Sequence, residues 1–189
     1  MTTDILNILG KLEKKPQRKL NDHVLIIDSM NLSIRNFVML QSMNHQGHHT
    51  GGLVGFLRSL GFLNRTFDPT RVICVFDGQG SSMNRKDINP EYKAQRVNKR
   101  ISNWDMFDNK EDEFASMTMQ MHRLVEYLQC LPTTLISMDK VEADDIISFL
   151  AQGFGSKGHR VTIVSADKDF LQVVDDNVEV YSPIEKKIY

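Results

Sequence analysis

Val141-Glu142-Ala143-Asp144-Asp145 places three carboxylates at the start of a predicted apolar helix. The apolar residues recur with helical spacing, at Ala143, Ile146, Ile147 and Leu150, which predicts one helix face packed on a core. The acids lie off that face. Free N–H groups and the helix dipole favour carboxylates in a first turn, so the stretch fits an ordinary helix start as well as a functional site.

More acids stand where other apolar runs end. Asp28 follows the run 24–27, Asp77 follows 72–76, and Asp167 and Asp169 come after 161–165. Each run predicts a buried strand with an acid at its carboxyl end. Ligands of open parallel sheets bind beyond that edge, so these carboxylates are expected to converge there.

Helical patterns over 29–43, 53–67 and 111–130 alternate with the strands, and a further strand is predicted over 133–138. This alternation predicts an α/β fold, a mostly parallel sheet with helices on both faces. In the 111–130 helix, Met117 and Met121 are expected to fill the core.

Gly153-Phe154-Gly155-Ser156-Lys157-Gly158 satisfies the spacing of a dinucleotide-binding loop. It follows a helix and precedes a strand, whereas the pyrophosphate of a dinucleotide needs a helix after the glycines. The glycines are therefore predicted to end a helix. The spacing of His45, His48 and His49 also fits no zinc template well.

The composition predicts one domain. At 189 residues and 41% apolar, the chain can bury a substantial core. Cys74 and Cys130 lie in apolar context and are expected as small buried hydrophobes in a reducing cytoplasm. No apolar run approaches the roughly 20 residues that span a bilayer, and no signal-peptide pattern is present, so a cytoplasmic protein without a membrane partner is expected.

Two segments stand apart from this pattern. Residues 3–15 predict an amphipathic helix, either packed on the domain or exposed as a partner-binding peptide.

The segment between residues 85 and 100 is basic. It holds six cationic residues and two acids, a local charge of +4, and Tyr92, Trp104 and Phe107 lie within it or follow it. Basic charge with aromatic side chains predicts nucleic-acid binding, although a solvated basic face is the ordinary alternative.

Converging carboxylates repel one another unless cations neutralise them, so the pattern predicts Mg²⁺ or Mn²⁺. Two such ions roughly 4 Å apart can activate a water and stabilise the leaving oxygen of a phosphodiester. Metal-assisted phosphodiester hydrolysis is the function that uses both the acids and the basic segment.

Together, the stretches 141–145 and 165–170, the strand-end acids Asp28 and Asp77, and Arg85 with Tyr92-Lys93-x-x-Arg96 resemble the 5′ nuclease superfamily. This superfamily comprises flap endonucleases and 5′ to 3′ exonucleases with a PIN-like three-layer fold and a basic helical arch. The resemblance runs from about residue 22 to the end of the chain. The tail 181–187 looks most similar to the ribonuclease H of T4-like bacteriophages, which removes RNA primers.

The resemblance implies a role for each matching residue. The acids of the first metal would be Asp28, Asp77, Glu142, Asp144 and Asp167, acting directly or through water, with Asp169 facing a second ion. Asp145 belongs to the same motif and is a further candidate metal ligand, ranked lower because helical spacing points it away from Ala143. Lys93 would offset charge on the scissile phosphate as a catalytic residue. The nucleic-acid contacts would come from Arg85, Tyr92, Lys93, Arg96, Lys99 and Arg100.

Members of the superfamily continue with a Gly-Asp-x-x-Asp-Asn segment and a helix-hairpin-helix, and this chain ends at Tyr189 before either. The expected organisation is an N-terminal helical extension over 1–20 and the PIN-like 5′ nuclease N-terminal domain over 21–189. The expected function is a Mg²⁺-dependent 5′ nuclease acting on RNA or DNA, with RNA primer removal in phage replication and replisome partners such as single-stranded-DNA-binding protein or a sliding clamp. The alternative is a catalytically weak nucleic-acid or replisome-binding module that lacks a complete second metal site.

Overall fold

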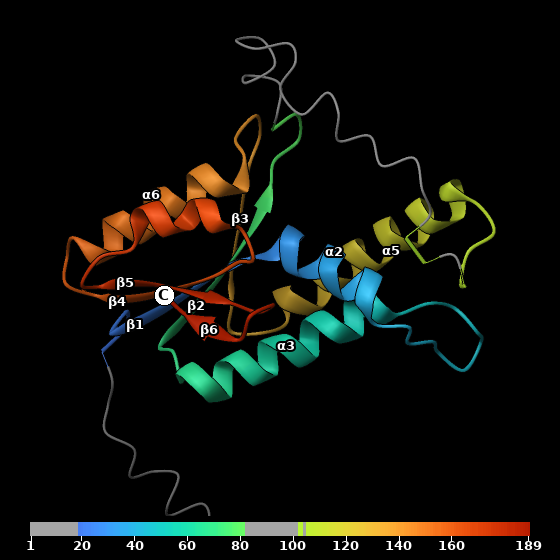
Figure 1. Ribbon diagram of the computed structural model, residues 1–189, viewed down its shortest axis with the longest axis horizontal. Helices are drawn as coiled ribbons and strands as arrows, with labels where there is room; N and C mark the ends of the chain where they lie inside the picture. The colour runs from blue at the N-terminus through green and yellow to red at the C-terminus, as the bar shows by residue number, and fades with distance from the viewer. Residues whose placement is uncertain (1–18, 82–101, 104) are drawn as a thin grey trace, which may run out of the picture.

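Six strands form one sheet at the centre of the computed structural model (Figure 1). The structure describes residues 19–81, 102–103 and 105–189. The strand order is β3-β2-β1-β4-β5-β6, and every neighbouring pair is parallel except β5 with β6. The strands are β1 (His23–Asp28), β2 (Arg71–Asp77), β3 (Thr134–Met138), β4 (Arg160–Val164), β5 (Val178–Ser182) and β6 (Lys187–Ile188).

Helices cover both faces of this sheet, as the alternating pattern predicts (Figure 1). One face packs against α2 (Ser29–Met39), α3 (Gly51–Phe67) and α5 (Lys110–Gln129). The other packs against α6 (Ala143–Gly155) and the short 3₁₀ helix η1 (Lys168–Val173). The predicted α/β class with a mostly parallel sheet and helices on both faces is therefore confirmed.

The central strands alternate their side chains between two apolar cores. Leu25 and Ile27 of β1 enter the core shared with α3 and α5, whereas Val24 and Ile26 enter the core under α6. Every residue of β1 is buried. A strand covered on both faces needs apolar side chains at consecutive positions, which explains the continuous run in the sequence.

Several predicted boundaries need correction. The helix expected over 29–43 ends at Met39, because Leu40 is extended and Met43 pairs in a β-bridge with His49. The prediction that Cys130 is buried is wrong: it caps the end of α5 on the exposed side. Cys74, inside β2, is buried as expected.

The glycine-rich stretch ends a helix, as predicted. α6 stops at Gly155, and Gly158 has a φ of +78°, a left-handed conformation that glycine adopts without steric cost. The strand β4 starts two residues later.

Two sequence predictions fall outside the described residues: the helix over 3–15 and the basic segment with its arch. Among the helices of ranges 19–81 and 105–189, none is both long and apolar enough to cross a membrane.

The end of β2 lies against β3 too closely to accept a side chain at Gly78. A Cβ there would lie 1.6 Å from the carbonyl oxygen of Met138. We expect Gly78→Ala to lower the free energy of unfolding by about 1 to 3 kcal/mol, because backbone rather than a flexible side chain must move. Gly153→Ala is the control: its Cβ meets nothing within 4 Å in a helix, so it should stabilise by about 0.5 to 1 kcal/mol. Urea unfolding measures both, and equal midpoints for the two variants would contradict the packing described.

Candidate active site

The predicted acids lie near the topological switch point, where the strand order of the sheet reverses. From β1 the chain crosses one face through α2 and α3 to reach β2, while β4 on the other side of β1 is reached through α6 on the opposite face. The switch therefore falls between β1 and β4, and ligands of open α/β sheets bind outside the carboxyl ends of strands at such a point. Asp28 ends β1, and Ser165 directly follows β4.

Asp28 is buried at this point, only 5% exposed. Its Oδ1 accepts the backbone N–H of Asn31 at 3.1 Å and so caps α2. Its Oδ2 accepts the hydroxyl of Ser165 at 2.9 Å, a bond across the switch from β1 to the segment after β4. The carboxylate is thereby fixed from both sides.

Asp77, at the end of β2, caps the N-terminus of α6. Its Oδ1 accepts the backbone N–H of Ala143 at 2.8 Å, which ties the first turn of α6 to the sheet edge. Glu142 occupies the N-cap position of α6 and is buried, yet its side chain does not make the capping bond. The helix that begins in the acidic stretch 141–145 is thus capped by a carboxylate from β2.

The other acids surround the same edge. Asp144 is partly buried in the first turn of α6, and Asp145 is exposed, as helical spacing predicted. Asp167 is half-buried and caps η1 by accepting the backbone N–H of Asp169 at 2.9 Å. Asp169 itself is exposed.

The acids act on one another electrostatically. Burial is the largest cause that raises the pKa of Asp28 from 3.8 to about 6. The negative charges of Asp144 and Asp77 add to this rise, and the hydrogen bonds from Asn31 and Ser165 oppose it. Asp28, Asp77 and Asp144 therefore share one electrostatic environment, although they come from three separate elements. Such an environment attracts a cation.

The donor set suits a hard cation, because its groups are carboxylate oxygens. Within ranges 19–81 and 105–189, no three acid, histidine or cysteine side chains are grouped as ligands of a single ion. That Asp28, Asp77, Glu142, Asp144 and Asp167 serve the first metal, and Asp169 the second, stays a prediction. Lys93, Arg96 and the other basic residues named from the sequence lie outside the described residues.

Ser165 is a site residue to which sequence reasoning gave no role. Its hydroxyl donates to Asp28 and accepts the backbone N–H of Asp167 at 3.1 Å, so it connects two of the predicted metal acids. Its place between a buried strand and the pair Asp167 and Asp169 was the available signal. The partner of its hydroxyl, 137 residues away, is visible only in the folded chain.

The three layers and the acids at the carboxyl edge define a PIN-like domain, as the resemblance implied. The chain belongs to the 5′-3′ exonuclease family and to the 5′ nuclease superfamily: residues 23–189 match the family model described as "5'-3' exonuclease, N-terminal resolvase-like domain".

Its relatives include nucleases of bacteria and phage. The chain is similar to the 5′-3′ exonuclease of Aquifex aeolicus, with 31% identity over 165 residues that cover 87% of this chain and 52% of the relative. It is also similar to the ribonuclease H of Enterobacteria phage T4, with 33% identity over 126 residues that cover 65% of this chain and 39% of the relative. The chain spans about half the length of the 5′-3′ exonucleases it matches.

Solved structures share the fold. The bacteriophage T5 flap endonuclease, in a complex with DNA and metal ions, superposes with a TM-score of 0.69 at 18% identity, covering 88% of this chain and 57% of that one. The T5 5′-exonuclease with bound zinc gives the same TM-score at 19% identity and the same coverage. At such identity the likeness concerns the fold.

The raised pKa of Asp28 predicts the pH dependence of stability in metal-free protein. Between about pH 4 and 6, Asp28 keeps a proton in the folded state that it has lost in the unfolded state. Its contribution to the free energy of unfolding therefore falls as the pH rises through that window. Asp28→Asn keeps an acceptor for Asn31 and removes the charge. We expect it to raise the free energy of unfolding by about 2 to 3 kcal/mol at pH 7 and by about 1 kcal/mol at pH 4.5.

Urea unfolding in EDTA at both pH values measures this difference. Asp145→Asn, at an exposed position on the same edge, is the control and should change stability by less than about 1 kcal/mol. A destabilised Asp28→Asn at pH 7 would contradict the electrostatic account.

Proposed function

We propose that this protein is a divalent-metal-dependent 5′ nuclease that hydrolyses phosphodiester bonds of RNA or DNA at 5′ ends and junctions. The observation that carries the proposal is the shared environment of Asp28, Asp77 and Asp144 at the switch point of the sheet. A chain of the 5′-3′ exonuclease family has little structural reason to gather these charges, because each raises the cost of ionising its neighbour.

The first metal, Mg²⁺ or Mn²⁺, would be held by Asp28, Asp77, Glu142, Asp144 and Asp167, and the second would face Asp169. Mg²⁺ usually binds one or two carboxylates and keeps several waters, so it needs no closed cage of protein ligands. Bound there, a pair of ions would supply an activated water and stabilise the leaving oxygen of the phosphodiester.

The chain's own residues orient this site. Ser165 fixes the Oδ2 of Asp28, and the Ala143 N–H fixes one oxygen of Asp77, so each carboxylate keeps its other lone pairs for a ligand. Lys93 and Arg96, in the basic segment that follows Asp77 in the chain, would attract the phosphates.

RNA primer removal in phage replication is the specific role we favour, with an RNA–DNA hybrid as substrate and replisome proteins as partners. The 33% sequence identity with the phage T4 ribonuclease H supports this role, and so does the resemblance of residues 181–187 to the ribonuclease H of T4-like phages. A host cytoplasm would be the setting.

A second candidate is a nucleic-acid or replisome-binding module with little turnover. It is favoured by one observation, that the described acids are not grouped as three ligands of one ion. A Mg²⁺-dependent cleavage assay on a 5′-labelled flap and on an RNA–DNA hybrid, with rate plotted against protein concentration, separates the two.

Asp144→Asn tests the metal assignment. It should reduce cleavage at least about 100-fold, because a metal ligand is lost, while the metal-free fold is kept or stabilised. Added Mn²⁺ should raise the melting temperature of wild type and not of this variant. Asp145→Asn, the next residue of the same helix, is the matched control and should retain most of the activity and the Mn²⁺ response. Unchanged turnover in Asp144→Asn would refute the site.

Arg96→Ala tests the basic segment. If Arg96 contacts a phosphate, its removal should weaken binding to all sequences alike and lower the slope of log affinity against log salt by about one. Fluorescence anisotropy over a salt series measures the slope. A slope equal to that of wild type would identify the segment as a solvated surface at this residue.

A further inference from the structure

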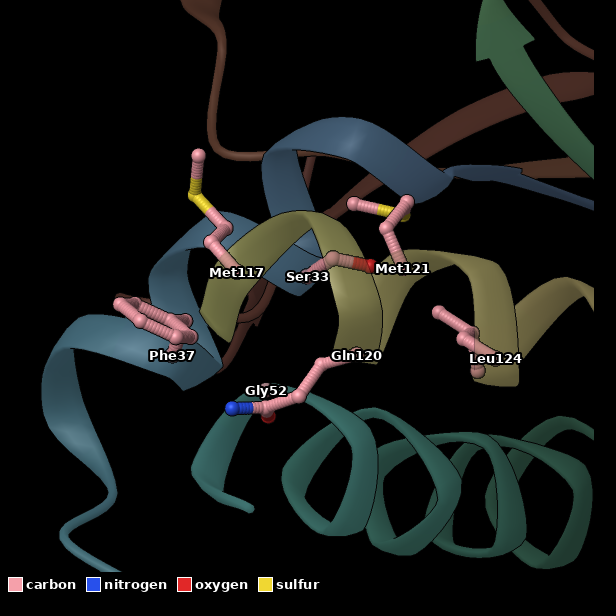
Figure 2. Close-up of a pocket in the computed structure, with 7 residues that line it drawn as sticks. All are labelled: Ser33, Phe37, Gly52, Met117, Gln120, Met121 and Leu124. Atoms are coloured by element: carbon pink, nitrogen blue, oxygen red, sulfur yellow. The ribbon is translucent and has the colours of Figure 1, made fainter. Parts of the chain in front are cut away.

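The cavity that the described residues enclose beneath α5 is too small for any ligand but water. Figure 2 shows Gln120 reaching from α5 toward α3, where it donates to the carbonyl oxygen of His49 at 2.9 Å. The cavity beside it is about 10 Å³, which is room for a single water. Glu113, also on α5, is buried and accepts the backbone N–H groups of Ser102 and Asn103 at 2.7 and 2.8 Å. These polar groups hold α5 in place, and a further ligand would have to bind at the surface.

The hairpin of β5 and β6 continues the sheet edge at which the acids lie. In the strand order β2-β1-β4-β5-β6, Asp77 and Asp28 end the first two strands, and Asp167 follows β4. The turn after β5 comes next at the same edge, because β5 is parallel to β4. The backbone N–H of Ser165 donates to the carbonyl oxygen of Tyr181 at 3.3 Å, which joins the segment before Asp167 to the end of β5.

Three lysines gather at this turn, and we call Lys168, Lys186 and Lys187 the hairpin lysine cluster. Lys168 reaches the hairpin from η1, with its Nζ 3.6 Å from the Oε1 of Glu185. Tyr189 also donates its hydroxyl to Glu185, and the Nζ of Lys187 lies 4.4 Å from the centre of the Tyr189 ring. Three lysines and one glutamate give this turn a net charge of +2.

Lys186 has a backbone conformation that does not suit a lysine. Its φ is +52°, in the left-handed region, and its N–H donates to the carbonyl oxygen of Ser182 at 2.8 Å to close the turn. Glycine or asparagine adopts this region at lower cost, so backbone geometry alone would favour either. The Lys186 side chain is exposed and makes no hydrogen bond or ion pair with the described part of the chain. The turn itself gives no reason for a lysine here, whereas an anionic ligand from solution would.

The spacing of the strands sets the distance from the cluster to the acids. Neighbouring strands lie about 4.8 Å apart and β4 lies between β1 and β5, so the end of β5 is about 10 Å from Asp28. One strand of a nucleic-acid duplex advances about 3.4 Å per nucleotide, so this distance corresponds to about three nucleotides. Asp167 and Asp169, which flank Lys168 in the chain, are the acids assigned to the metals, so the cluster lies directly beside the proposed chemistry.

We propose that the hairpin lysine cluster binds the phosphate backbone of the substrate strand, about three nucleotides from the phosphodiester that lies at the acids. Lysine attracts phosphate as a point charge and carries no base preference, so the ligand class is RNA or DNA of any sequence. A strand held at the cluster and at the metal is fixed at two points, which sets the phosphodiester that enters the site. The inference rests on the proposed function, in which the acids hold the metal.

The first test removes one charge and keeps the turn. Lys186→Asn introduces a side chain that adopts the left-handed region more readily than lysine, so the midpoint of urea unfolding should stay equal or rise. Binding of a 5′-fluorescein flap duplex is followed by anisotropy in EDTA over a salt series. Affinity should fall about threefold, and the slope of log affinity against log salt should fall by about one.

Lys157→Asn is the matched control. Lys157 is also exposed, but it precedes β4 and therefore lies at the opposite edge of the sheet from the acids. The variant loses the same charge, and its affinity and salt slope should equal those of wild type.

The second test locates the contact on the nucleic acid. A methylphosphonate linkage removes the charge of one phosphate, and moving it along the flap strand measures the contribution of each phosphate in turn. In wild type, a linkage about three nucleotides from the position cleaved in Mg²⁺ should weaken binding. The same linkage should have no further effect in Lys186→Asn, because the charge that it would meet is already absent.

An unchanged salt slope in Lys186→Asn, or an equal loss in Lys157→Asn, would overturn the cluster as a phosphate contact. Loss of the Lys186-dependent effect to a linkage far from the cleaved position would overturn its place on the strand. A wild type that shows the Lys186-dependent linkage but does not cleave would refute the proposed function and leave the cluster as a binding surface. Failure of wild type to bind the duplex would overturn both.

Discussion

The bond from the Ala143 N–H to Asp77 Oδ1 is the contact on which the site depends most. It joins the first turn of α6, with its own acids, to the end of β2, so that a helix from one face of the sheet is held at the carboxyl edge. The helix dipole favours the arrangement, because the positive end of α6 meets a carboxylate. Asp144 is thereby held near Asp28 in spite of the repulsion between them.

Repulsion among these acids is a cost that the fold carries. The buried Asp28 is held in place by Asn31 and Ser165, and burial with two negative neighbours raises its pKa to about 6. A bound cation would relieve that repulsion. Metal affinity and the free energy of unfolding therefore depend on the same charges. This linkage explains why neutralising a site acid should stabilise the metal-free protein while removing its chemistry.

The second polar centre, around Glu113, has a different character. Its carboxylate meets three donors, from Lys110, Ser102 and Asn103, so its charge is satisfied within the protein. A buried anion with all its partners orders backbone, whereas a buried anion among other anions attracts an ion. Asp28 and Glu113 are thus both buried carboxylates, but only Asp28 lies among other negative charges that a cation could neutralise.

The strands, the helices on both faces, and the sheet edge at which Asp28, Asp77 and Asp167 lie could be predicted from the sequence, because apolar periodicity and strand-end position are local properties. The solvent-facing Cys130 and the end of α2 at Met39 were not predictable from apolar context, since they depend on what packs nearby. Three contacts could not be predicted in this way: Asp77 caps α6, Ser165 donates to Asp28, and Glu113 accepts the backbone N–H groups of Ser102 and Asn103. The bonds to Asp77 and Asp28 join residues 66 and 137 positions apart, and no periodicity of the chain encodes the partner of a hydrogen bond across such a separation.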